Sequence, residues 1–105
     1  MRIIYAAILG AMIAARAQAV EAIVKTDYLA CNSERLFDRA DRIRKSGDEK
    51  ALKAFTTGAV LSQSCVSLKS GDSVFTEGRG KGSGTIKIRP KGAFKTFFTS
   101  ELAFQ

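Results

Sequence analysis

The sequence contains no histidine, no tryptophan and a single proline. Histidine is the commonest general base and metal ligand, so its absence excludes Ser–His and Cys–His nucleophile pairs. The two cysteines cannot supply the roughly four nitrogen and sulfur ligands of a structural zinc site. We therefore expect no metal, no cofactor and no enzyme activity. Paired carboxylates, which suffice for glycan hydrolysis, stay as an alternative, although most acidic residues fall where helix capping or a turn explains them.

The first nineteen residues have the pattern of a secretory signal peptide. Arg2 is followed by an uncharged run from Ile3 to Ala15, and Ala17-Gln18-Ala19 offers small residues at the cleavage site. The run is shorter than the roughly 20 residues that span a bilayer. We expect cleavage after Ala19 or, as a second choice, after Ala22. The mature protein, residues 20–105, would then be a single periplasmic or secreted domain without a transmembrane span.

Cys31 and Cys65 both lie in the expected mature chain. A small exported domain with two cysteines favours a disulfide between them, since the compartment is oxidising and the core is small. Two buried free thiols are the alternative.

Positive charge is concentrated in the second half of the mature chain. Without Arg2 and Arg16 the net charge falls from +7 to +5, and residues 66–105 carry seven basic but only three acidic side chains. Such a segment favours anionic partners: acidic protein faces, anionic glycans or phospholipid headgroups. Nucleic acid is a weaker fit, because the protein is expected outside the cytoplasm.

The residue pattern predicts an α+β protein with two unlike halves. Residues 28–61 favour a helical hairpin, with a first helix capped by Ser33 and stopped by Gly47 and a second helix capped by Asp48. Ala51, Leu52, Phe55 and Ala59 are expected on the buried side of the second helix. From Cys65 onward, short alternating segments separated by turns predict strands at 65–68, 73–77, 85–89 and 94–99, closing into a small antiparallel barrel.

The order of these strands and turns resembles the bacterial SH3-like domain. Lys69-Ser70-Gly71-Asp72-Ser73-Val74 matches the strand–Gly-Asp turn–strand segment, and Phe97-Phe98-Thr99-Ser100-Glu101-Leu102 matches the aromatic strand and terminal 3₁₀ turn. The resemblance implies an SH3-like barrel over residues 65–104. The mature chain is also similar to small exported bacterial proteins of unassigned role, in which a helical hairpin precedes such a segment. Without a Trp or an RT loop, proline-rich peptide recognition is not expected.

The glycine-rich segment Gly78–Gly84 does not have a P-loop pattern, since Gly82 separates Lys81 from Ser83 and a strand follows. It reads either as a mobile hairpin loop or as a loop that orders on an acidic partner. The residues expected to bind a partner are the outward-facing cations of the glycine-rich loop and the barrel, together with two phenylalanines that would lie beside them if partly exposed. They are Arg79, Lys81, Lys87, Arg89, Lys91, Lys95, Phe75 and Phe97.

The leading functional hypothesis is a small periplasmic or secreted binding protein. A basic barrel face would engage an envelope protein, peptidoglycan or another anionic glycan, as an inhibitor, immunity protein or adaptor does. A structural envelope component that binds nothing is the alternative, with carboxylate-based glycan hydrolysis behind it.

Overall fold

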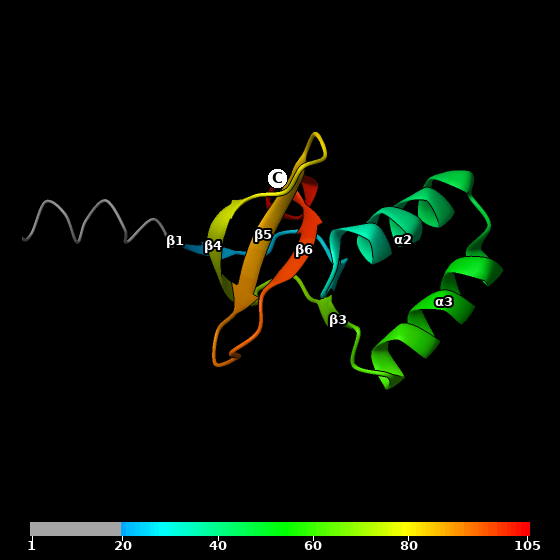
Figure 1. The fold of residues 1–105 in the computed structure, drawn as a ribbon, viewed down its shortest axis with the longest axis horizontal. Coiled ribbons are helices and arrows are strands. Elements are labelled where there is room, and N and C mark those ends of the chain that lie inside the picture. The colour runs from blue at the N-terminus through cyan, green and yellow to red at the C-terminus, as the bar shows by residue number, and fades with distance from the viewer. Residues whose placement is uncertain (1–19) are drawn as a thin grey trace, which may run out of the picture.

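Six antiparallel strands and two α-helices form the α+β architecture of residues 20–105, the part of the chain that the computed structural model describes (Figure 1). The predicted leader at 1–19 lies outside these residues. In chain order the elements are β1 (Val20–Ile23), β2 (Tyr28–Cys31), α2 (Glu34–Ser46), α3 (Glu49–Leu61), β3 (Cys65–Leu68), β4 (Ser73–Arg79), β5 (Thr85–Pro90), β6 (Phe97–Ser100) and a terminal 3₁₀ turn, η1 (Glu101–Phe104).

The six strands form one open sheet in the order β1-β4-β5-β6-β2-β3. β1 and β3 are its two edges and do not pair with each other, so the structure does not contain the closed barrel expected for residues 65–104. The sheet nevertheless curls, because the chain just after β1 bonds to the turn after β3. Val24 donates its N–H to the Asp72 carbonyl at 2.8 Å and accepts from the Gly71 N–H at 2.7 Å.

The helical pair is an insertion between two paired strands, rather than a unit that precedes the sheet. β2 and β3 pair antiparallel, with Cys31 opposite Cys65, and both helices leave and return at that end (Figure 1). The helical segment is therefore shorter than the expected 28–61, since Tyr28–Cys31 forms a strand. β1 was also not expected from the sequence. Both segments are only four residues long, and both are held by partners more than thirty residues away.

Local capping confirms the predicted helix ends. The Ser33 hydroxyl accepts from the Leu36 N–H, and the Asp48 carboxylate accepts from the Ala51 N–H. Gly47 ends α2 in the left-handed conformation, with φ of 81°, which glycine adopts without a Cβ penalty. The four apolar residues predicted on the buried side of the second helix are only partly covered, because α3 buries none of its residues.

Two clusters of buried side chains lie on opposite faces of the sheet. The larger one fills the concave face and includes Val24, Val74, Ile88 and Phe97. The smaller one lies where the insertion joins the sheet and contains Cys31, Phe37 and Cys65, with Phe98 packed beside them. α2 thus anchors the insertion through Phe37 and Ala40, whereas α3 lies farther out.

Candidate partner-binding surface

Three of the six cations expected to bind a partner form ion pairs within the protein. Arg79 bonds Glu101 at 3.1 Å, Arg89 bonds Glu77 at 2.9 Å, and Lys91 bonds Glu21 at 3.2 Å. Hydrogen bonds to Arg89 and Thr96 lower the pKa of Glu77, and hydrogen bonds to Ser73 and Lys91 lower that of Glu21. Both carboxylates therefore stay ionised beside their cations, and this side of the sheet is less cationic than its lysines and arginines suggest.

The two aromatics of the expected set lie in different environments. Phe97 is 5% exposed and belongs to the concave core, so the expectation that it is partly exposed is wrong. The reason is its register, which places it directly opposite the buried Ile88 of β5. Phe75 lies on the other face, partly buried, with the Arg89 guanidinium 4.8 Å from its ring centroid. Phe98 lies on the face of the sheet opposite to Phe97, partly buried against the Cys31–Cys65 cluster, with the Lys87 ammonium 5.9 Å from its ring centroid.

The glycine-rich loop is fastened to the start of α2. The Glu34 carboxylate accepts the N–H of Lys81 at 2.9 Å and that of Gly82 at 2.7 Å. These two backbone hydrogen bonds lower the pKa of Glu34. The loop packs closely here, since a Cβ on Gly80 would lie 2.6 Å from the Glu34 carboxylate oxygen. The loop is therefore held by an acidic side chain of the protein itself. The two predictions were a mobile hairpin loop and a loop that orders on an acidic partner, and the structure shows a loop ordered by the protein's own Glu34.

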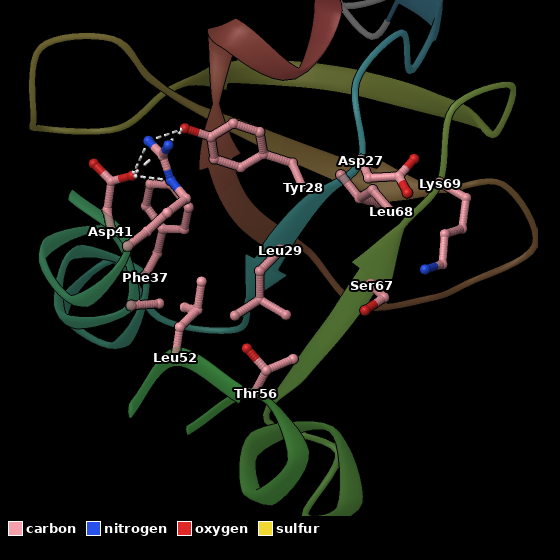
Figure 2. Close-up of a pocket in the computed structure, with 12 residues that line it drawn as sticks. Asp27, Tyr28, Leu29, Phe37, Asp41, Leu52, Thr56, Ser67, Leu68 and Lys69 are labelled. Atoms are coloured by element: carbon pink, nitrogen blue, oxygen red, sulfur yellow. Dashed lines mark hydrogen bonds and ion pairs between the residues drawn. The ribbon is translucent and has the colours of Figure 1, made fainter. Parts of the chain in front are cut away.

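An apolar groove lies between the helical insertion and strands β2 and β3 (Figure 2). Its volume is about 210 Å³, and Leu29, Phe37, Leu52 and Leu68 are among the apolar residues that line it. Thr56 of α3 and Ser67 of β3 stand at its lower side in Figure 2. The groove is open because α3 diverges from the sheet instead of packing down on it.

A polar cluster closes one end of this groove. Arg44 donates to the Tyr28 hydroxyl at 2.5 Å and to Asp41 at 2.9 Å, and its guanidinium lies 4.8 Å from the Tyr28 ring centroid. Partial burial raises the pKa of Asp41, but hydrogen bonds and charge from Arg44 and Lys45 outweigh it, so the net shift is downward. The cluster fixes α2 against β2 and therefore fixes the width of the groove.

A second apolar hollow of about 390 Å³ lies on the other side of β3. Val66, Leu68, Pro90 and Phe97 line it, and Phe94 and Lys95 stand in the loop beside it. Phe94 was expected to begin the last strand, but that strand begins at Phe97, and the Phe94 side chain is 99% exposed. Lys95 is thus the one cation of the predicted set that borders an apolar hollow.

The Cys31–Cys65 disulfide is formed, as the sequence predicted. It joins β2 and β3, two neighbouring strands at the base of the helical insertion, whereas the predicted bounds placed Cys31 in the helical hairpin (28–61) and Cys65 in a strand. Neither apolar hollow was foreseen, because their lining comes from strands and helices far apart in sequence. The sequence did contain one indication of the groove: α3 carries several apolar residues, which the short helical hairpin leaves partly exposed.

The acidic side chains of residues 20–105 are mostly engaged in structural contacts. Asp48 caps α3, Asp72 accepts from the Lys69 N–H at 2.9 Å, and Asp27 accepts from the Ser70 N–H at 2.8 Å. Across this part of the chain, no group of three or more His, Cys, Asp or Glu residues is arranged to hold a metal ion.

Comparison with known proteins adds no relative: no family model, no curated protein and no solved structure matches this chain. Within residues 20–105, none of the helices has the length and apolar character needed to cross a membrane.

Proposed function

We propose that this chain is a small exported binding protein that engages a protein or cell-envelope partner in the periplasm or the extracellular medium. The observation that carries the proposal is the pair of apolar hollows beside β3, one of which is bordered by the exposed Phe94. A monomer gains no stability from an apolar ring in water, whereas aromatic anchors next to apolar pockets contribute most of the affinity at protein interfaces.

Export is part of the proposal and rests on residues 1–19 and on the disulfide. A disulfide between buried cysteines is stable in an oxidising compartment and rare in a reducing one. Expression of the full chain in a bacterium, followed by cell fractionation and N-terminal sequencing, tests it. We expect the mature protein in the periplasmic fraction with Val20 as its first residue. Full-length protein that stays in the cytoplasm with reduced cysteines contradicts the proposal.

An SH3-like origin of the sheet belongs to the same proposal. The Gly-Asp turn, the alternating β5, the aromatic β6 and the terminal 3₁₀ turn follow one another in the order of that fold. The helical insertion then replaces the loop between two of its strands, and the ligand surface moves to the junction of insertion and sheet.

Site-specific photo-crosslinking tests where binding occurs. The oxidised mature protein would carry a photoreactive residue in turn at Thr56 in the groove, at Phe94, at Lys87 on the basic face, and at Ser83 in the glycine-rich loop as control. With cell-envelope extract, we expect one partner crosslinked from Thr56 and Phe94 and not from Ser83. Crosslinking from Lys87 alone favours the basic face instead. If no position crosslinks a partner, although deletion of the gene has a phenotype, a purely structural role is favoured. Turnover of labelled peptidoglycan by the purified protein would favour hydrolysis.

A further inference from the structure

We propose that the free edge of β3 is a strand-addition site, where an extended acidic segment of the partner protein pairs with Cys65–Leu68. This inference rests on the proposed binding function and specifies the class of ligand and how it is held. Strand addition supplies affinity through main-chain hydrogen bonds and specificity through pockets for alternate side chains.

The register of the sheet leaves backbone groups of β3 pointing outward. Antiparallel ladders alternate hydrogen-bonded and non-hydrogen-bonded pairs. The Asn32 N–H donates to the Ser64 carbonyl at 2.8 Å, so the Leu29–Ser67 pair, three residues further along the ladder, is a non-hydrogen-bonded one. The Cα atoms of Cys31 and Cys65 lie 3.9 Å apart, in keeping with the shorter spacing of such pairs. The Ser67 N–H and carbonyl therefore point away from β2.

The outward groups of Ser67 are accessible. β3 is the last strand in the sheet order, and Ser67 is exposed. Within residues 20–105, no loop or side chain hydrogen-bonds the Ser67 backbone. A strand placed here would continue the sheet by one position.

The two hollows lie on opposite sides of this edge, and both include Ser67 and Leu68 in their lining. Successive side chains of a strand point to opposite faces. An added strand would therefore direct one side chain toward the groove of Leu29 and Leu52, and the next toward the hollow beside Phe94. Two adjacent apolar residues in an extended peptide fit this arrangement.

The charges around the edge favour an acidic peptide. Lys69 and Lys95 border the two hollows, both are exposed, and neither forms an ion pair within the described chain. The nearby carboxylates of Asp27 and Asp72 accept hydrogen bonds from the backbone of the β3–β4 turn. A second copy of this chain would instead bring another net charge of +5 from its own residues 20–105 to the edge, and like net charges oppose association. Charge thus selects a foreign acidic segment over self-pairing.

A random peptide library displayed on phage, selected against the oxidised mature protein, provides the probe. We expect enriched peptides with two adjacent apolar residues flanked by Asp or Glu. Ser67→Pro removes the outward N–H without breaking a bond to β2, and we expect it to weaken binding about tenfold or more relative to the matched Ser67→Ala. Phe94→Ala should weaken binding by about tenfold, as loss of an aromatic anchor does. Lys69→Glu with Lys95→Glu should weaken it most at low salt.

Hydrogen exchange in the wild-type protein gives a second measurement that does not depend on a variant folding. Addition of a selected peptide should slow exchange of the Ser67 amide. Equal affinity of Ser67→Pro and Ser67→Ala, an unprotected Ser67 amide, or a selection that enriches nothing acidic overturns strand addition. The crosslinking result then still decides the binding function separately, because it reports contact at Thr56 or Phe94 whatever the partner's conformation.

Discussion

Strand β5 and helix α3 each carry several apolar side chains, but they cover them to very different extents. In β5, Ile88 is completely buried and Thr85 is nearly so, whereas none of the thirteen residues of α3 is buried. The sheet closes around its own concave core, and the helical insertion is anchored at its base by the disulfide, Phe37 and the Arg44 cluster. The buried core that stabilises the protein and the proposed binding surface therefore lie in different parts of one small protein.

Breaking the disulfide should have the largest effect and should act mainly on the insertion. The bond closes the loop that contains both helices, and the chain-entropy model assigns about 3.8 kcal/mol to a loop of this length. Urea unfolding of the oxidised and reduced proteins would measure the loss, and hydrogen exchange would locate it. We expect exchange in α2 and α3 to accelerate more than in β4 and β5. Uniform acceleration across the chain would show that insertion and sheet unfold together.

Truncation of Ile88 tests the sheet side of the comparison. Ile88 is 0% exposed at the centre of the concave core, and Ile→Ala at such sites costs about 2–5 kcal/mol through lost burial and the cavity left behind. Leu61→Ala at the end of α3 is the matched control, because Leu61 is 78% exposed and its loss should change the free energy of unfolding by about 0.5 kcal/mol or less. Urea midpoints compare the two variants. A similar cost for both would mean that α3 is packed as firmly as the sheet.

The same contrast explains what sequence reasoning could predict. The caps at Ser33, Gly47 and Asp48 and the turn at Asp72 follow from chemistry within a few residues, and the structure confirms them. Strand β2 could not be predicted from its four residues, because what makes it a strand is pairing with β3 beyond the two helices.

For the candidate site, the sequence predicted which residue types would take part but not which contacts they make. Residue types identified the cations, but not that Glu21, Glu77 and Glu101 would face three of them across the sheet. The last strand was predicted to begin at Phe94, and Phe97 was expected to be partly exposed. The strand begins three residues later, so Phe97 is buried in the core and Phe94 is left in solvent.

Gly80→Ala should disconnect the glycine-rich loop from the insertion. The new Cβ would lie 2.6 Å from the Glu34 carboxylate oxygen and 2.9 Å from Cγ2 of Thr85, which is buried. Because the Thr85 methyl is held in the sheet, the new Cβ would displace the Glu34 carboxylate and shift the loop locally, and both backbone hydrogen bonds would be lost. We expect amide exchange at Lys81 and Gly82 to accelerate about fivefold to tenfold, with little change in the sheet. Glu34→Gln, which keeps the shape and removes the charge, separates sterics from hydrogen bonding. Unchanged exchange in both variants would contradict the role of Glu34 in holding the loop through Lys81 and Gly82, an interaction called the Glu34 clamp below.

The Glu34 clamp should depend on pH in a defined way. Hydrogen bonds from Lys81 and Gly82 hold the pKa of folded Glu34 below its ordinary value of 4.5. Its stabilisation is therefore fully present above about pH 4.5 and is lost as pH falls through the lower, folded-state pKa. Backbone chemical shifts of Lys81 and Gly82, followed on acidification, should report one carboxylate titration that Glu34→Gln abolishes. A titration that persists in this variant would have to come from another acid.

The smallest expected effect is a gain in the free energy of unfolding, from a substitution in α3. It tests from the helical side whether α3 is less closely packed than the sheet. Gly58 lies within α3, a Cβ there would meet nothing within 4 Å, and Ala is favoured over Gly in a helix interior by about 0.5–1 kcal/mol. Gly58→Ala should raise the free energy of unfolding by up to that amount, whereas Gly47→Ala should lower it, because φ at Gly47 is 81°. Thermal unfolding of both variants measures the pair. A loss of stability in Gly58→Ala would mean that α3 lies closer to its neighbours than the open groove requires, and Leu52 and Thr56 would then be unavailable to a partner.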